Sequence, residues 1–129
     1  MNYLGIDYGR SKIGLAIGDS DTKLTTPLKT IWYKETTDLY KKIKKILIEQ
    51  SIDKVVIGLP DGKIVQDVKK FGQALSKETG HKVEFQDETL TTKDAQKLSV
   101  LAGINRTKRK KMEDAYSAAL ILQEYLDSK

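Results

Sequence analysis

The chain has 129 residues, and its 23 Lys and Arg against 18 Asp and Glu give a net charge of +5 at pH 7. It contains no cysteine and one histidine, His81, which excludes disulfides, cysteine-ligated zinc or iron–sulfur sites and histidine-rich metal sites. Any metal site must therefore use oxygen ligands, which suits Mg²⁺ or Mn²⁺. The basic balance favours an anionic partner, and we expect nucleic acid because no strongly amphipathic basic helix argues for a membrane surface.

A chain of this length can bury one hydrophobic core, and residues 1–129 contain no repeat, low-complexity segment or linker. We therefore expect a single domain. No stretch approaches the roughly 18 apolar residues that span a bilayer. The first residues enter a predicted strand without the basic-then-apolar pattern of a signal peptide, so we expect a cytoplasmic protein with no membrane partner.

The N-terminal residues predict a β-hairpin whose first strand ends at an acid. Alternating apolar residues run up to Asp7, turn residues follow from Tyr8 to Lys12, and Ile13 to Gly18 reads as the returning strand. Gly5 and Gly9 flank Asp7 at a spacing of two, and we expect them to leave room for metal and phosphate beside the carboxylate. The alternative is that Asp7 only starts a turn.

The rest of the chain predicts strands that alternate with helices. Lys23 to Tyr33, interrupted by Pro27, reads as a third strand that completes an antiparallel meander. The elements expected after it are a helix from Thr36 or Thr37 to about Gln50, a doubly covered strand from Asp53 to Pro60, a helix from Val65 to Gly80, a strand from Lys82 to Gln86, a short helix from Thr91 or Thr92 to Gly103, and a last helix from about Met112 to Leu126. This order predicts an α/β fold with a mixed five-stranded sheet that is flanked by helices on both faces.

Three acidic segments stand where this fold would bring them to one edge of the sheet. Asp7 ends the first strand, Asp87 and Glu88 follow the last strand, and Asp114 is expected in the first turn of the last helix. Carboxylates gathered in this way repel one another unless a cation lies between them, so we expect one or two Mg²⁺ or Mn²⁺ ions. Such ions hold an attacking water and the oxygens of a phosphodiester, which predicts hydrolysis.

Each of these acids also has a purely structural interpretation. Asp114 can stabilise a helix N-terminus, and the pair Asp87 and Glu88 can begin a polar loop. Their conjunction with Asp7 is stronger evidence than any one of them. Alternation puts Asp87 on the side of Val83 and Phe85, although a twist at the strand end could present Glu88 instead. The sequence leaves open which of the two binds metal.

The most basic stretch runs from Asn105 to Lys111 and is predicted as a loop immediately before Asp114. Its charged members are Arg106, Lys108, Arg109, Lys110 and Lys111. Beside an acidic site they would guide a phosphate backbone, together with Arg10 and Lys12 from the hairpin turn. The alternative is a solvated loop. The lysines between Lys41 and Lys45 fall away from the apolar stripe of their helix and are interpreted as a solvated face, and the aromatic residues form no base-stacking series.

Several short motifs occur in an order that is typical of one protein family. They are Gly5-Ile6-Asp7-Tyr8-Gly9, Ile13-Gly14-Leu15-Ala16 with Gly18-Asp19, Thr26-Pro27-Leu28, Val56-Ile57-Gly58-Leu59-Pro60, Asp87-Glu88 with Leu90-Thr91-Thr92, and Asp114-Ala115 with Ala118-Ala119 and Ile121-Leu122. Over nearly the whole chain they resemble the YqgF family. The resemblance implies an RNase H-like fold related to Holliday-junction resolvases, and a nuclease that acts in 5′ maturation of precursor 16S ribosomal RNA. It also supports Asp7, the Asp87-Glu88 pair and Asp114 as the acidic metal-binding set.

Two departures from the family pattern concern substrate contacts. The family usually has an arginine directly after the Asp-Glu pair, where this chain has Thr89. If that arginine contacts phosphate in the family, another residue of this chain must make the contact or the contact is lost. The family also commonly has a longer loop after Gly-Leu-Pro, which is reduced here to the residues from Asp61 to Ile64.

The leading hypothesis is a Mg²⁺-dependent nuclease of structured RNA. In it Asp7 bridges the metal ions, Glu88 or Asp87 is a second ligand, and Asp114 completes the site. A second hypothesis is resolution of branched DNA, which needs a symmetric homodimer to cut paired strands. The other two are a nucleotide-binding protein, since Asp-x-Gly in a hairpin also resembles the phosphate loop of actin-like ATPases, and a non-catalytic RNA-binding module in ribosome biogenesis.

Overall fold

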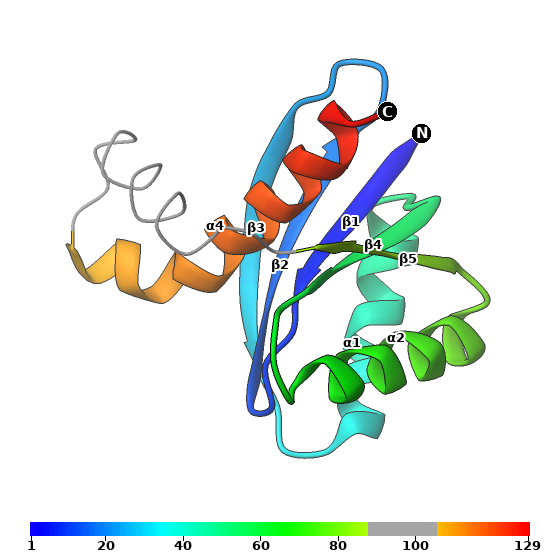
Figure 1. The fold of residues 1–129 in the computed structure, drawn as a ribbon, viewed down its shortest axis with the longest axis vertical. Coiled ribbons are helices and arrows are strands. Elements are labelled where there is room, and N and C mark those ends of the chain that lie inside the picture. Colours follow the sequence, from blue (N-terminus) through cyan, green and yellow to red (C-terminus); the bar gives the residue numbers. More distant parts are fainter. Residues whose placement is uncertain (88–105) are drawn as a thin grey trace.

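The computed structural model of the chain describes residues 1–87 and 106–129, with the side chains of the second part described from Met112 onward. The strands are β1 (Asn2–Asp7), β2 (Lys12–Asp19), β3 (Thr25–Trp32), β4 (Lys54–Leu59) and β5 (Lys82–Asp87), and the helices are α1 (Thr36–Glu49), α2 (Val65–Thr79) and α4 (Arg106–Asp127). Figure 1 shows the strands as one sheet with helices packed against it. The predicted short helix from Thr91 to Gly103 lies outside the described residues.

The five strands form a mixed sheet in the order β3-β2-β1-β4-β5. The first three are antiparallel neighbours because short turns connect them. The connections to β4 and β5 contain α1 and α2, and these strands are parallel to β1. The carboxyl ends of β1, β4 and β5 therefore meet at one edge of the sheet, and the predicted α/β fold with a mixed five-stranded sheet is confirmed.

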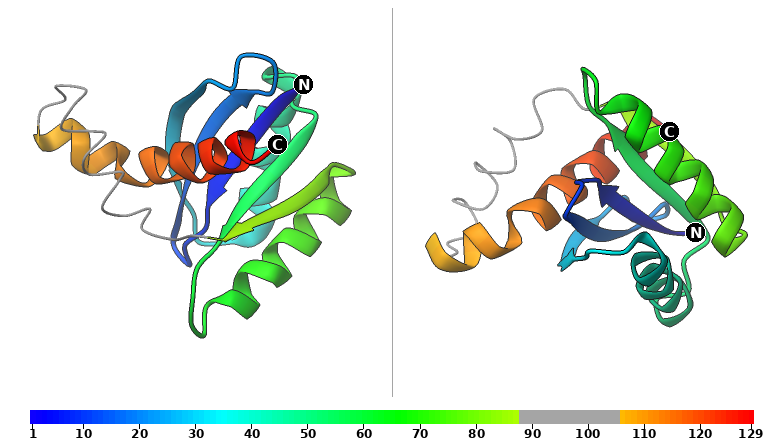
Figure 2. Two further views of the ribbon diagram at one scale, coloured as in Figure 1. Left: turned by 45° about the horizontal axis from the view of Figure 1, so that its top comes forward. Right: turned by 90° about the horizontal axis from the view of Figure 1, so that it is seen from below.

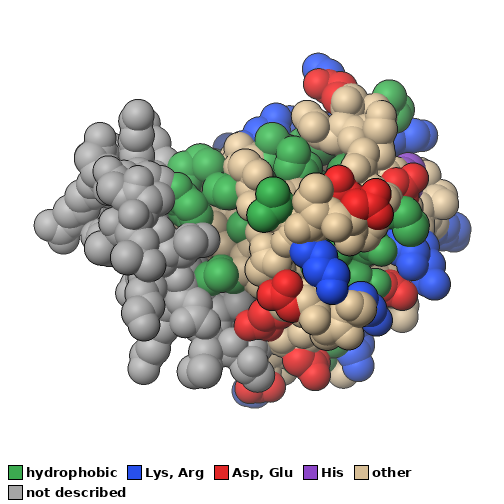
Figure 3. All heavy atoms as spheres, turned by 90° about the horizontal axis from the view of Figure 1, so that it is seen from above, with side chains coloured by type: hydrophobic (Ala, Val, Ile, Leu, Met, Phe, Trp, Pro, Cys, Tyr) green, Lys and Arg blue, Asp and Glu red, His purple; other side chains and the backbone are tan. Residues whose placement is uncertain are grey.

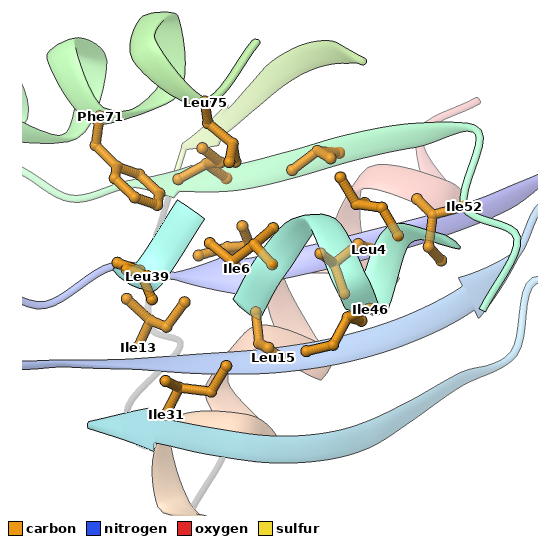
Figure 4. Packing of buried hydrophobic residues seen from close by; sticks show 14 of the residues in the cluster. Leu4, Ile6, Ile13, Leu15, Ile31, Leu39, Ile46, Ile52, Phe71 and Leu75 are labelled. Carbon is orange, nitrogen blue, oxygen red and sulfur yellow. The ribbon is translucent and has the colours of Figure 1, made fainter. Parts of the chain in front are cut away.

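The larger core lies between the sheet and the pair α1 and α2. Figure 4 shows side chains of β1, β2 and β3 that point toward those helices. The fully or nearly buried members of this cluster include Leu4, Ile6, Ile13, Leu15, Val55, Ile57, Leu39, Ile43, Leu47, Val68, Phe71 and Leu75. Odd and even residues of a strand face opposite ways, so the residues that alternate with this set must face the other helix.

Helix α4 covers that other face and packs against the strands (Figure 2). Its apolar residues Ile121 and Leu122 pack on Tyr3 and Val56. Closer to the start of the helix the contacts are small residues, Ala118 and Ala119 against Ala16 of β2. Small side chains on both surfaces let the two backbones approach, and this approach positions one of the predicted site acids.

Helix α4 begins at Arg106, six residues before the predicted start at Met112. The prediction of a loop from Arg106 to Lys111 is therefore wrong for the backbone of this stretch. Lysine and arginine are good helix formers, and no Gly or Pro interrupts the segment, so the helix continues upstream of its apolar stripe. Asp114 accordingly does not lie in the first turn, and its interpretation as an acid that stabilises the helix N-terminus does not apply.

No helix among the described residues is long and apolar enough to cross a membrane. On the face seen in Figure 3, which carries both termini, basic and acidic side chains are interspersed, and hydrophobic side chains gather beside the grey atoms. This face lies at the opposite end of the sheet from the carboxyl end of β1 (Figure 1). The coloured side chains of that face therefore form no continuous basic surface.

Candidate functional site

Asp7 is the last residue of β1 and lies on the face of the sheet that α4 covers. Its Cα is paired with that of Gly14 in the antiparallel ladder. Gly5, two residues earlier on the same face, shows what covers it, because a Cβ built there would meet the Ala118 carbonyl oxygen and the Leu122 Cβ at 2.9 Å. Alternation then directs Asp7 to the α4 side at the exposed end of the strand.

Asp114 reaches the same place from α4. A Cβ built on Gly14 would lie 1.9 Å from the carbonyl oxygen of Asp114 and 2.1 Å from its carbonyl carbon, so the helix backbone rests directly on this glycine. Gly14 is the register partner of Asp7, and directly paired residues share one face of a sheet. Two acids that are 107 positions apart in the sequence thus flank one glycine.

The Lys12 ammonium stands at this acidic centre. Lys12 Nζ lies 3.0 Å from Asp114 Oδ2, and the side chains are 41% and 25% exposed. The same Nζ lies 5.0 Å from the centroid of the Trp32 ring, within cation–π distance. In this arrangement a fixed positive charge already balances the Asp114 carboxylate.

Tyr33, the residue after β3, holds the turn between β1 and β2 in place. The Tyr33 hydroxyl donates a hydrogen bond to the carbonyl oxygen of Gly9, two residues after Asp7. Burial of the Tyr33 hydroxyl, followed by its interaction with Tyr8, raises the pKa of Tyr33 above its ordinary value. The phenol therefore remains a neutral donor throughout the physiological range and keeps the turn in place.

The glycines beside Asp7 serve the fold rather than a ligand. Gly5 gives room to α4, as described above, and a Cβ on Gly9 would lie 2.5 Å from the carbonyl oxygen of Lys12, inside the turn itself. The interpretation of both as clearance for metal and phosphate is wrong at this point. The important glycine is Gly14, which the sequence signals weakly as part of the small-residue series Gly14, Ala16 and Gly18 on one face of β2.

Asp87 ends β5 on the opposite face of the sheet from Asp7. It is exposed and pairs with Leu59, which packs on the larger core together with Val83 and Phe85. The neighbouring Glu84 faces the other way, since its carboxylate accepts a hydrogen bond from the Tyr125 hydroxyl of α4. Glu88 lies outside the described residues. Among the residues that are described, no three acidic or histidine side chains form a group that could hold a metal ion.

The structure describes the side chains of some of the basic residues predicted to contact nucleic acid, and only the backbone of the others. Arg10 donates from Nε and Nη2 to Asp67 Oδ2, at 3.1 and 2.8 Å, with 70% of its side chain exposed. Lys12 pairs with Asp114, as above. The residues Arg106, Lys108, Arg109, Lys110 and Lys111 lie on the first two turns of α4, and the structure describes their backbone only. That part of α4 precedes Asp114 directly.

Comparisons with known proteins give the same fold and a family. A protein of Carboxydothermus hydrogenoformans named "Putative pre-16S rRNA nuclease" is 41% identical over 138 aligned positions, which cover 100% of this chain and 98% of the relative. A protein of Shewanella denitrificans with the same name is 38% identical and is matched over 93% of its length.

Two solved resolvase structures resemble the model. RuvC of T. thermophilus in complex with Holliday junction substrate matches with a TM-score of 0.64 at 14% identity, over 99% of this chain and 94% of that one. The Fowlpox virus resolvase in complex with Holliday junction DNA matches with a TM-score of 0.65 at 14% identity, over 99% and 98%. At this identity they establish the fold alone, and it is the predicted RNase H-like class. The family model described as "RuvX: Holliday junction resolvase" matches residues 1–128, which confirms the family resemblance and the nuclease class, and the chain belongs to the RuvX family.

Proposed function

We propose that this protein is a metal-dependent nuclease that hydrolyses phosphodiester bonds in structured RNA, in the 5′ maturation of precursor 16S ribosomal RNA. The observation that carries the proposal is the meeting of Asp7 and Asp114 at Gly14, at the carboxyl edge of the sheet. Relatives of nearly the same length that are named for this activity support the substrate. A nuclease of ribosomal RNA precursors works where ribosomes are assembled, so we expect this protein in the cytoplasm.

The donor chemistry fits one or two Mg²⁺ or Mn²⁺ ions. The groups concerned are carboxylates, the ligands that such hard cations prefer, and a cationic stand-in, the Lys12 ammonium, lies against one of them. Nucleases of this class are generally dependent on divalent metal ions. A bound ion would lower the pKa of a water and stabilise the charge that develops on the phosphate oxygens.

Asp7 and Asp114 would hold the metal together with Glu88. Asp87, the last residue of β5, faces the same way as Val83 and Phe85, which pack against the larger core on the far face. Glu88 has the parity of Glu84, whose carboxylate contacts α4. We therefore assign the third ligand to Glu88 and expect Asp87 to contribute charge without binding the ion.

The chain's own cations would hold the phosphate backbone. Lys12 lies at the acidic centre, and Arg10 is largely exposed on the same turn. An ion pair as exposed as Arg10–Asp67 is worth about 0–1 kcal/mol and yields easily to a phosphate. The basic first turns of α4, from Arg106 to Lys111, would continue this surface away from Asp114.

A cleavage assay tests the proposal. In Mg²⁺ the protein is expected to shorten precursor 16S ribosomal RNA at its 5′ side, to lose this activity in excess chelator, and to regain it when Mn²⁺ is added. Cleavage that persists in the chelator, or an intact precursor under all conditions, would contradict the assignment.

A second candidate function is the resolution of branched DNA. Its support is the family description and the fold shared with two resolvases that were solved with Holliday junctions. This function requires a homodimer with two sites related by symmetry. A four-way DNA junction in the same assay separates the candidates, since symmetric nicking of the junction without cleavage of the RNA would favour resolution.

Lys12 gives a prediction that concerns metal binding alone. Lys12→Met removes the ammonium that balances Asp114, so the dissociation constant for Mn²⁺ should fall about fivefold, or ~1 kcal/mol. Calorimetric titration with Mn²⁺ measures this. Arg10→Met, which removes a cation paired with Asp67 instead, should leave the constant unchanged. Equal or weaker Mn²⁺ binding by Lys12→Met would show that metal does not compete with this ammonium.

A further inference from the structure

A groove of about 500 Å³ lies between the edge strand β3 and helix α1. Leu28, Ile31 and Ile46 contribute to its lining as apolar residues, and Lys29, Lys42 and Lys45 contribute as cations. Trp32 also lines the groove at the end of β3, where Lys12 is its register partner on β2. The groove therefore begins beside the candidate site.

Trp32 is one of the large apolar residues that the described part of the chain leaves exposed. Its side chain keeps 65% of its surface exposed although the Lys12 ammonium lies 5.0 Å from the ring centroid. Ile31, the preceding residue, is buried in the larger core, so alternation holds the ring of Trp32 out of that core. An indole ring fixed at a strand end is a surface on which a nucleobase can stack.

The charge of the groove suits a polyanion. Lys45 Nζ lies 3.9 Å from Glu49 Oε1, a weak exposed pair on one helix face. Lys29 and Lys42 form no ion pair with the residues that the structure describes. Helix α1 follows β3 after a short turn, so Lys42 and Lys45 come before Glu49 along the groove from Trp32. Positive charge is thus concentrated toward the candidate site.

The lysine run of α1 divides between two surfaces. Lys42 and Lys45 line this groove, whereas Lys41 and Lys44 line a separate hollow with Thr37, Tyr40 and Glu78. The interpretation of the run as one solvated face does not distinguish these two surfaces. In the sequence the lysines form one block. Only two of them line the groove, because residues of β3 form its other side.

We propose that the groove between β3 and α1, with Trp32 at its entrance, binds a single-stranded segment of the nucleic acid that flanks the scissile phosphate. The proposal rests on the proposed function in taking nucleic acid as the ligand. One base stacks on Trp32, and Lys42 and Lys45 neutralise the phosphates that follow. A single strand is favoured because its unpaired bases present their faces to an exposed aromatic ring.

The fluorescence of Trp32 reports directly on this binding, because it is the only tryptophan of the chain. A ten-nucleotide uridine RNA, titrated in chelator so that no cleavage occurs, is expected to quench the fluorescence, and a blunt RNA duplex of equal length is not. Trp32→Ala should weaken binding about tenfold by anisotropy of a labelled RNA. Absence of quenching by the single strand would overturn the proposal.

A matched pair of lysine variants tests the groove itself. Lys42→Gln with Lys45→Gln should weaken binding and lower the slope of log affinity against log salt by about 1.4, since each phosphate contact to a single strand contributes about 0.7. Lys41→Gln with Lys44→Gln makes the same change on the same helix and should keep the slope. Equal effects of the two pairs would overturn the proposal and indicate non-specific electrostatic attraction between the protein and the RNA.

The outcome is separable from that of the proposed function. Asp7→Asn should bind the uridine RNA as the unchanged protein does in chelator, because Asp7 lies outside the groove. Quenching that depends on Lys42 and Lys45 supports the groove even if Asp7→Asn leaves cleavage intact. If the uridine RNA does not quench Trp32 of the unchanged protein and the Lys42 and Lys45 variant cleaves normally, the groove is overturned and the nuclease assignment stands.

Discussion

Asp7→Asn is expected to lower Mg²⁺-dependent cleavage about 10³-fold or more while the fold is retained. The substitution keeps the shape of the side chain but removes the charge that would hold a divalent ion at the end of β1. Removing a single group that stabilises charge in a transition state typically costs 10²–10³ in kcat, and a carboxylate that held the metal would support both activation of the water and stabilisation of the phosphate charge. Single-turnover cleavage of precursor ribosomal RNA measures the effect.

The matched control for Asp7→Asn is Asp61→Asn, which changes an exposed acid in the turn after β4. It should cleave at the unchanged rate. Thermal unfolding of both variants within a few degrees of the original protein would show that the fold is kept. If Asp7 only shapes the turn, Asp7→Asn would cleave as the control does, and the assignment of the site would be wrong.

Gly14→Ala is expected to destabilise the protein by about 3 kcal/mol, the upper range for overpacking. The new Cβ would lie 1.9 Å from the Asp114 carbonyl oxygen, which is backbone and cannot move aside as a side chain can. Gly14 does not have a positive φ, so the cost is steric and not conformational. For a chain of this size the melting temperature should fall by about 10 °C.

Gly18→Ala provides the comparison on the same strand and face. A Cβ at Gly18 would meet Leu122 Cδ2 at 2.8 Å and Thr25 Cγ2 at 3.0 Å, which are side-chain atoms that can shift. Its loss of stability should be clearly smaller. Gly14→Ala should also reduce cleavage more than its stability explains, because it moves Asp114 away from Asp7. Equal melting temperatures for the two variants would contradict the close packing of α4 on β2.

Much of the fold could be predicted because hydrophobic period and turn residues determine it locally. The strands that end at Asp7 and near Asp87, and the helices that begin near Thr36 and Val65, follow from such patterns. The start of α4 could not, because the basic residues from Arg106 onward extend the helix without adding to its apolar stripe. Local helix propensity, not the hydrophobic period, sets that boundary.

The candidate site was accessible from the sequence only in part. Asp7 and Asp114 could be named because acids stood at expected element ends, although Asp114 comes to Asp7 through the contact of α4 with Gly14 and not through a helix N-terminus. The face occupied by Asp87 follows from alternation, which the sequence already contained. The ion pair of Lys12 with Asp114 depends on a tertiary contact that no local pattern encodes.

A crystal structure of the protein with Mn²⁺, with the ion located by anomalous scattering, tests directly whether Asp7 and Asp114 hold a metal ion. We expect an ion about 2.1 Å from carboxylate oxygens of Asp7 and Asp114, with Glu88 as a further ligand and the Lys12 ammonium displaced from Asp114. Bound Mn²⁺ that contacts neither Asp7 nor Asp114, or an ammonium that remains paired with Asp114 at saturating Mn²⁺, would contradict it.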